Sequence, residues 1–256
     1  MSAASTDTRP LAVRTVPLTQ PLRWLGRAWQ DFGIAPEVDL AHGVLLAAFG
    51  AALLLLAGDR FWWLAGAFSG FLIVAPILAT GLYAVSRAAE RGEPAGLFTV
   101  WSVWASLDRR LVAFGLLLAL AGTGWVIVSA ALITLLAPHP IHTPTDFVRY
   151  IVVGDRSGLF PLWLGLGGLL AAPVFASSVV SIPLLLDRRV TVWQAVLTSW
   201  RAVMVNPLPL GIWAAVVMTL TLLGLGTFLF GLVLVMPVLG HATWYAYRDL
   251  VEPEAA

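Results

Sequence analysis

The sequence predicts an all-α membrane protein with six transmembrane helices, arranged as three hairpins that each follow a short amphipathic helix at the cytoplasmic membrane surface. Two observations support this fold class. Hydrophobic residues make up 59% and charged residues 11% of the 256-residue chain, whereas charged residues make up about 25% of an average soluble domain. In addition, the stretch from Ala202 to Tyr247 contains no Asp, Glu, Lys or Arg. As one helix it would be about 70 Å long, against about 30 Å for the hydrocarbon core of a bilayer, so we expect it to cross the membrane twice.

The N-terminal residues 1–18 mix Ser, Thr, Pro and Arg without periodicity, and we expect them to be disordered. We predict a single transmembrane domain over residues 19–251 and a short tail over residues 252–256. The domain begins with apolar side chains at helical spacing, opposite a polar face: Leu22, Leu25, Trp29 and Phe32 against Arg23, Arg27, Gln30 and Asp31. This pattern is typical of a helix that lies in the headgroup region.

Six apolar stretches follow, and each is long enough to cross a bilayer. The predicted crossings are residues 41–57, 61–86, 111–137, 158–186, 207–223 and 227–247. We place the turn between the last two at Gly224-Leu225-Gly226. Proline removes one backbone hydrogen bond from a helix, so three prolines inside the crossings are predicted kinks: Pro76, Pro173 and Pro237.

Three amphipathic segments look like copies of one unit, an interfacial helix followed by a hairpin. In each copy a tryptophan precedes a crossing, and in the first and third copies a proline of the second arm lies eleven residues before an arginine. The predicted interfacial anchors in this pattern are Trp29, Trp104, Trp200, Arg87 and Arg248. An internal repeat is one interpretation; coincidence among Trp- and Pro-rich membrane segments is the other.

The distribution of arginine predicts the orientation. Twelve arginines fall in the N-terminal segment, the second and fourth loops and the tail, whereas three fall on the opposite side: Arg60, Arg149 and Arg156. Because positively charged loops stay in the cytoplasm, both termini and all three interfacial helices are predicted to be cytoplasmic.

Several motifs resemble a known family. They are Ile182-Pro183-Leu184-Leu185-Leu186-Asp187-Arg188, Asn206-Pro207, Gly240-His241-Ala242-Thr243-Trp244, and Gly81-Leu82-Tyr83 with Arg87, Glu90, Arg91, Gly92 and Glu93. The chain resembles the predicted bacterial integral membrane proteins of domain-of-unknown-function family twenty-one eighty-nine, over roughly residues 22–251 and most densely in the last third. The resemblance implies a multi-pass protein of the bacterial inner membrane, and it supplies no activity, substrate or cofactor.

Two histidines, His42 and His241, are the ionisable side chains that we expect within the apolar layer. In the six-crossing topology both lie toward the cytoplasmic side, so they could meet. Facing imidazoles can bind haem or a metal ion, which makes this pair the candidate cofactor site. The simpler alternative, which the absence of a nearby carboxylate favours, is that each ring hydrogen-bonds a neighbouring helix. We therefore predict no cofactor.

A second candidate metal site is His139 and His142 in the longest external loop, with Asp146 and Asp155 nearby. Nitrogen and oxygen donors of this kind can bind zinc or copper, but a zinc site usually has four defined ligands. The prolines that alternate with these histidines explain the segment equally well as a rigid extended loop, so we predict no metal.

The sequence contains no catalytic motif that we recognise, and we predict that the protein is not an enzyme. A net charge of +1 argues against nucleic acid as a partner. The predicted function is a scaffold or accessory protein that organises membrane partners or lipids, with the bilayer and other membrane proteins as its partners. The alternative is a small-solute or lipid transporter with proline-broken helices, although no charged residue lies inside a predicted crossing.

Overall fold

A computed structural model describes residues 9–57, 67, 78–106, 108–154 and 158–253. These residues are mainly helical and contain one isolated antiparallel bridge, between Val13 and Val251. Residues 78–90 are helical. The other elements are α1 (Gln20–Asp31), α2 (Pro36–Ala57), α4 (Leu97–Ala105), α5 (Arg109–Leu136), α6 (Pro144–Asp146), the π-helix η1 (Phe147–Val153), α7 (Leu159–Ser178), α8 (Ser181–Asp187), α9 (Val192–Val205), α10 (Pro207–Gly226) and α11 (Leu232–Leu250).

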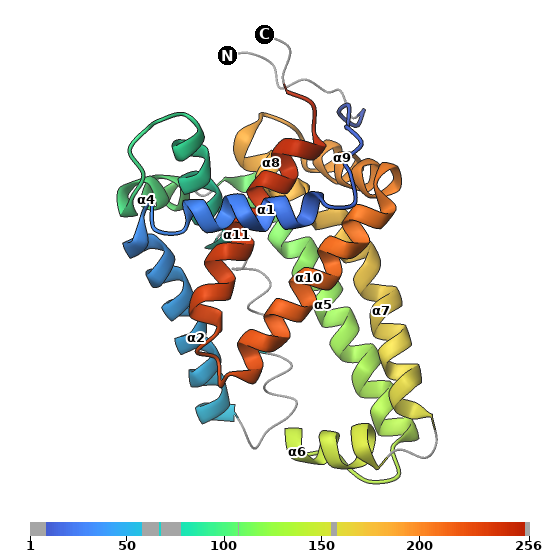
Figure 1. The fold of residues 1–256 in the computed structure, drawn as a ribbon. Coiled ribbons are helices and arrows are strands. Elements are labelled where there is room, and N and C mark those ends of the chain that lie inside the picture. Colours follow the sequence, from blue (N-terminus) through green and yellow to red (C-terminus); the bar gives the residue numbers. More distant parts are fainter. Residues whose placement is uncertain (1–8, 58–66, 68–77, 107, 155–157, 254–256) are drawn as a thin grey trace.

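The long helices form a bundle with two different ends (Figure 1). Helices α2, α5, α7, α10 and α11 run between the ends. Helices α1, α4 and α9 lie at the end from which both termini emerge, and α1 runs across the bundle there. The short α6 lies at the opposite end. We call the first of these the terminal end.

Among the described residues, four helical stretches are long and apolar enough to cross a membrane. They are Pro36–Leu56, Arg109–Leu136, Leu159–Asp187 and Pro207–Gly226. They coincide with four of the six predicted crossings, so the prediction of an all-helical protein with several membrane-length helices is confirmed. The predicted crossing at 61–86 falls largely outside the described residues, and its last part, residues 78–86, is helical.

The turn between α10 and α11 lies later than predicted. Helix α10 continues through Gly224-Leu225-Gly226, and the chain reverses over residues 227–231. A Cβ atom on Gly224 would lie 2.7 Å from Leu232 Cδ2, so this glycine serves close packing of the two helices. The turn itself contains two non-glycine residues in the left-handed region, Phe228 (φ 53°) and Leu229 (φ 73°).

The hydroxyl of Thr227 stabilises this turn. It donates a hydrogen bond to the carbonyl of Gly224 (2.9 Å) and accepts one from the backbone N–H of Gly231 (2.8 Å). These contacts satisfy backbone groups that the end of α10 leaves free. Glycine was therefore a misleading marker, since the position of the turn depends on a threonine cap.

Two of the predicted kink prolines lie inside continuous helices. Helix α7 passes Pro173 and α11 passes Pro237. The interruption near the end of the fourth crossing is at residues 179–180, between α7 and α8. Its position follows from Pro183, which has no N–H to bond the carbonyl of Val179. Pro76 lies outside the described residues.

Helix α11 is the centre of the fold, because it packs against α1, α2, α8 and α10. Its buried side chains include Trp244 and Tyr247, which belong to the largest apolar core cluster. Trp24 of α1 joins the same cluster and makes an edge-to-face contact with Trp213 of α10, with ring centroids 5.6 Å apart. Helix α1 is thus part of the core as well as a surface helix.

Residues 9–18 are the described part of the N-terminal segment. They form hydrogen bonds with the α9 region and the end of α11, whereas composition predicts disorder. The backbone N–H groups of Leu11 and Val16 donate to Thr198 Oγ1 (3.0 Å) and Asn206 Oδ1 (2.8 Å) of the α9 region. The Arg14 guanidinium donates to the carbonyls of Arg248 and Val251. A cation at the C-terminus of α11 is favoured by the helix dipole. All these partners are distant in sequence, which is why local composition did not reveal them.

Helix α9 turns its polar side chains inward. Gln194, Thr198 and Ser199 are buried, whereas the apolar Trp193 and Met204 are exposed. The Ser199 hydroxyl accepts from the backbone N–H of Val180 (3.1 Å). Helix α1 buries Asp31 together with the apolar Trp24 and Ala28, and it exposes Leu22 and Trp29. Exposed apolar faces of this kind suit a lipid environment.

Candidate functional site

The ring nitrogens of the two candidate histidines, His42 and His241, lie close to protein oxygen atoms. His42 Nδ1 lies 2.8 Å from the carbonyl oxygen of Val38, and its Nε2 lies 3.2 Å from that of Leu78. His241 uses Nδ1 on Ser86 Oγ (2.7 Å) and Nε2 on Asp39 Oδ1 (2.9 Å). Every ring nitrogen of the two histidines is therefore engaged. Within the described parts of the chain, no group of three His, Cys, Asp or Glu residues could hold a metal ion.

His241 belongs to a chain of hydrogen bonds that we call the buried polar cluster: Asp31, Asp39, Ser86, His241 and Tyr245. Beyond the two contacts of His241, the Ser86 hydroxyl donates to Asp31 Oδ2 (2.7 Å), and the Tyr245 hydroxyl donates to the same oxygen (2.7 Å). Asp39 Oδ2 accepts from the backbone N–H of Gly33 (3.0 Å). All five side chains are at most 6% exposed.

Four elements meet at this cluster: α1, α2, the helix over residues 78–90, and α11. Asp39 lies in the first turn of α2, where the helix dipole favours a carboxylate. Close backbone approach brings the other partners into range. A Cβ on Gly43 of α2 would lie 2.2 Å from the carbonyl oxygen of Val233, and one on Gly240 of α11 would lie 2.5 Å from Leu82 Cδ1. Side chains at these two glycines would push the helices apart.

Asp39, His241 and Ser86 follow the order of a hydrolytic triad, but their setting differs from an active site. His241 and Ser86 are fully buried, and neither lines the cavity described below. The serine proton is donated to Asp31, whereas a serine nucleophile gives its proton to the histidine and faces the substrate. The arrangement does not offer an accessible nucleophile.

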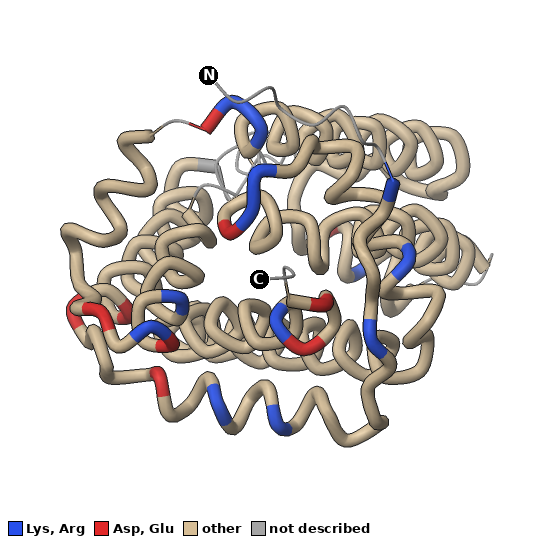
Figure 2. Tube along the Cα trace, turned by 90° about the horizontal axis from the view of Figure 1, so that it is seen from above, with Lys and Arg blue, Asp and Glu red and all other residues tan. Residues whose placement is uncertain are grey.

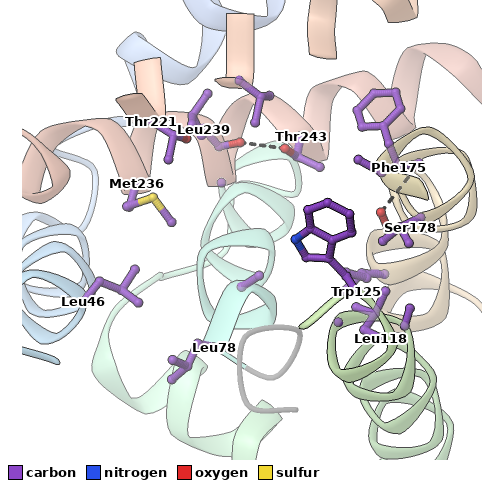
Figure 3. A pocket seen from close by; sticks show the side chains of 18 of the residues that line it. Leu46, Leu78, Leu118, Trp125, Phe175, Ser178, Thr221, Met236, Leu239 and Thr243 are labelled. Atoms are coloured by element: carbon purple, nitrogen blue, oxygen red, sulfur yellow. Dashed lines mark hydrogen bonds between the residues drawn. The ribbon is translucent and has the colours of Figure 1, made fainter. Parts of the chain in front are cut away.

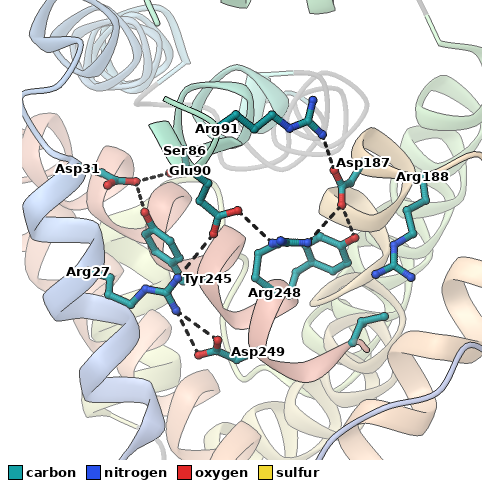
Figure 4. A network of polar contacts seen from close by, with 12 residues as sticks. Arg27, Asp31, Ser86, Glu90, Arg91, Asp187, Arg188, Tyr245, Arg248 and Asp249 are labelled. Atoms are coloured by element: carbon teal, nitrogen blue, oxygen red, sulfur yellow. Dashed lines mark hydrogen bonds and ion pairs between the residues drawn. The ribbon is translucent and has the colours of Figure 1, made fainter. Parts of the chain in front are cut away.

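A second group of polar side chains surrounds the cluster at the terminal end, and we call it the charged network: Arg27, Glu90, Arg91, Asp187, Arg248 and Asp249 (Figure 4). Arg27 contacts Asp249 (3.2 Å) and Glu90 (3.6 Å). Arg248 contacts Glu90 (3.0 Å) and Asp187 (3.8 Å), and Asp187 also pairs with Arg91 (3.7 Å). The network links α1, α8, α11 and residues 78–90.

The two groups touch through Tyr245, because the Arg27 guanidinium lies 3.8 Å from the centre of its ring. Charged residues are spread over this whole end, as the view onto it shows (Figure 2). An exposed ion pair contributes little to the free energy of unfolding on its own. The main effect of the network is that it connects several helices to one another.

The predicted interfacial anchors occupy different environments. Arg87 donates to the carbonyl of Leu186 (3.0 Å), and Arg248 belongs to the charged network. Trp29 is exposed, and Trp200 donates from Nε1 to Ser177 Oγ (2.9 Å). Trp104 lies against His42, with ring centroids 5.4 Å apart. The five residues share the terminal end, but they do not share one role.

An apolar cavity of about 740 Å³ lies between the long helices (Figure 3). Its lining comes from α2, α5, α7, α10, α11 and residues 78–83, and includes no charged side chain among the described residues apart from the titratable His42. Small residues on α5 and α7 leave the space: Ala121, Gly122, Gly167, Gly168 and Ala171.

Two of the hydroxyls on the cavity wall are used within their own helices. Ser178 donates to the carbonyl of Phe175 (3.3 Å), and Thr243 donates to that of Leu239 (2.7 Å). The indoles of Trp125 and Trp163 also face the cavity, with ring centroids 5.5 Å apart, and Trp163 donates from Nε1 to Ser129 Oγ (2.6 Å). The cavity therefore suits an apolar molecule.

Among the described residues, the histidines of the external loop belong to no group of three possible metal ligands. The His139 ring packs on Tyr150, with centroids 4.7 Å apart. The Asp146 carboxylate accepts from the backbone N–H groups of Thr143 (2.9 Å) and His142 (3.1 Å). These hydrogen bonds, with Thr143 the larger contributor, hold the pKa of Asp146 below its ordinary value. Asp146 acts as a helix cap here, and Asp155 lies outside the described residues.

Membrane-length apolar helices and a charged terminal end define a polytopic α-helical integral membrane protein. Residues 63–187 match the family described as predicted integral membrane protein (DUF2189). This match confirms the resemblance found in the sequence. No curated protein and no solved structure matches the chain.

The matched segment covers the middle of the chain, whereas the motifs suggested the densest similarity in the last third. Ser86 and Asp187 lie inside it. Asp31, Asp39 and the segment around His241 lie outside it. Most of the buried polar cluster therefore comes from parts of the chain beyond the family match.

Proposed function

We propose that this protein is a non-enzymatic inner-membrane protein that holds a lipid in the cavity between its helices. The cavity carries this proposal: its volume of about 740 Å³ falls within the range of about 300–1,000 Å³ usual for ligand pockets. The described lining residues include no carboxylate and no arginine, which favours an acyl chain over a polar solute. Exposed tryptophans on α1, α4 and α9 would anchor the terminal end at the headgroups.

The proposed topology has six crossings, with both termini in the cytoplasm. The four membrane-length helices would be completed by residues 61–86 and by α11, whose 19 residues extend about 28 Å. Three observations support this orientation. Both termini lie at one end of the bundle. By the predicted topology, twelve of the fifteen arginines fall on that side. Arg149 belongs to η1, which directly follows α6 at the opposite end. Arginine-rich segments stay in the cytoplasm.

Reporter fusions would test the orientation. A fusion at Ala95, between residues 78–90 and α4, is expected to give a cytoplasmic signal. A fusion at Thr145 in α6 is expected to give a periplasmic signal, because α6 lies at the opposite end of the bundle. Paired reporters that are active on only one side of the membrane measure both positions. Equal cytoplasmic signals from the two fusions would contradict the six-crossing topology.

Filling the cavity should displace the lipid. Gly168 of α7 lines the cavity, and a Cβ atom added to it would have no other atom within 4 Å. Gly168→Leu is therefore expected to reduce retained phospholipid about tenfold, equivalent to about 1.4 kcal/mol. Native mass spectrometry of protein purified in mild detergent and titrated with phosphatidylethanolamine measures this.

The matched control is Gly165→Leu, three residues earlier on the same helix. Gly165 also has free space at its Cβ, but it does not line the cavity. Equal lipid retention by the two variants, both at wild-type level, would contradict the cavity as the lipid site.

Transport is the second candidate function, and one observation favours it. Asp39 lies inside the membrane-length helix α2 and is fully buried, and ionisable residues in this position are typical of ion-coupled carriers. Ion-dependent flux of a solute or lipid in proteoliposomes containing the pure protein would establish transport. Flux that does not depend on the protein would leave lipid holding as the function.

A further inference from the structure

The hydrogen bonds of the buried polar cluster constrain where its protons lie. The Ser86 hydroxyl has one proton, and the geometry directs it to Asp31 Oδ2. Ser86 Oγ must then accept from His241 Nδ1, which lies 2.7 Å away. On the other side of the ring, Nε2 faces Asp39 Oδ1 at 2.9 Å, so an ionised Asp39 also needs a donor there. Both ring nitrogens carry protons in this arrangement, and His241 is an imidazolium between two carboxylates.

A second arrangement of the same atoms holds the same number of protons. The Nδ1–H bond of His241 breaks as a bond forms to Ser86 Oγ, while the Ser86 O–H bond breaks and its proton joins Asp31 Oδ2. His241 becomes neutral with its proton on Nε2, and Asp31 becomes a neutral carboxylic acid. No electron is transferred and no atom is lost. The two heavy-atom separations that the proton shift uses are both 2.7 Å.

The two ends of this hydrogen-bonded chain face different surroundings. Asp31 lies toward the terminal end, where it meets Tyr245 of α11, and Tyr245 in turn meets Arg27 of α1. Glu90, on the helix over residues 78–90, pairs with that arginine. Asp39 lies on α2, one helical turn from His42, which interacts electrostatically with both Asp39 and His241 and which lines the cavity. The series of hydrogen bonds from Asp31 to Asp39 therefore runs from the charged network toward the cavity.

We propose that the buried polar cluster is a proton-binding site: Asp31, Asp39 and His241 together hold one proton more than two ionised aspartates and a neutral histidine would, and Ser86 passes it between His241 and Asp31. The argument is one of charge and geometry. Without the additional proton, His241 Nε2 would face the ionised Asp39 as a second acceptor at 2.9 Å, or Ser86 Oγ and His241 Nδ1 would lack a shared donor. Unpaired buried charge of this kind is very costly. The proposal does not depend on lipid binding.

Nuclear magnetic resonance of ¹⁵N-histidine-labelled protein in lipid nanodiscs tests the proposal at neutral pH. His241→Gln assigns the resonances, and the chain contains four histidines in all. In the wild-type protein, His241 is expected to be an imidazolium, or to be neutral with a carboxylic acid at Asp31. Infrared spectroscopy detects that acid as a C=O band that disappears in Asp31→Asn. A neutral His241 together with ionised Asp31 and Asp39 would overturn the proposal.

The role of Ser86 has its own test. Ser86→Ala removes the acceptor at Nδ1, so His241 is expected to become neutral with its proton on Nε2 and with no exchange to Asp31. Ser102→Ala is the control, because Ser102 is an exposed serine of α4 that bonds its own helix at Thr99. An imidazolium at His241 in Ser86→Ala would exclude the relay. If that variant does not fold, the wild-type protonation state still decides whether the site holds the proton.

Discussion

Replacement of His241 by alanine is expected to lower the free energy of unfolding by about 3–5 kcal/mol, the range for breaking a buried ion pair. The reason is Asp39, whose side chain is fully buried against His241. Without the imidazole, Asp39 keeps the hydrogen bond from the Gly33 backbone N–H and loses its contact with His241 Nε2. Denaturant unfolding in mixed micelles, followed by tryptophan fluorescence, measures the loss.

Two comparisons identify the ion pair as the cause. Thr243→Ala removes a hydroxyl from the same helix that bonds only the carbonyl of Leu239, and it should cost about 1 kcal/mol or less. In an Asp39→Ala background, His241→Ala should cost clearly less than in the wild-type protein, because the carboxylate is already gone. Strictly additive losses would show that the two side chains do not stabilise one another.

Trp24→Ala is expected to cost about 3–5 kcal/mol, as large-to-small changes of core aromatic residues do. Trp24 lies on α1, yet it is fully buried, packs on the Trp213 ring and donates from Nε1 to Asp249 Oδ2 (2.9 Å). Its loss would open a cavity between α1, α10 and α11. The same unfolding assay measures the effect.

Trp29 is the matched control, because it lies on the same helix and is 58% exposed. Trp29→Ala should change the free energy of unfolding by at most about 0.5 kcal/mol. Trp24→Phe keeps most of the ring and removes the hydrogen bond, so it should have an intermediate cost. Equal effects at positions 24 and 29 would mean that α1 is attached to the bundle only loosely.

The membrane-length helices could be predicted because each is encoded by one continuous apolar run. This signal is local: α2, α5 and α10 begin and end close to predicted crossings, and α7 together with α8 covers the fourth. The turn before α11 was misplaced because glycine has two uses. It allows a turn, but it also allows close helix packing, and at Gly224 the packing of Leu232 decides.

The orientation of the amphipathic helices could not be read from their patterns. An apolar face normally indicates the side that is buried in protein, but in a membrane it can face lipid instead. In α9 the polar residues Gln194 and Thr198 face inward because they bond the N-terminal segment. Neither helix spacing nor composition contains this information.

The buried polar cluster was missed for a related reason. Asp31 fits the polar face of a surface helix, and Asp39 lies just before the first predicted crossing, and both positions are typical of residues in contact with water. His241 was found because a histidine is conspicuous in an uncharged stretch, but its partner was sought in His42. One signal was present: Asp39 directly precedes an apolar run, only three residues before His42.

The pairing of the two ends of the chain has a consequence for synthesis. Asp39 and His241 are 202 residues apart, and Arg14 contacts the residues that follow α11. Contacts between such distant segments slow folding, because a long loop must close before they form. During translation, α1 and α2 are made long before α11. Asp39 therefore lacks the imidazole of His241 until α11 is complete. The last helix to be made therefore completes the core and also supplies the side-chain partner of Asp39.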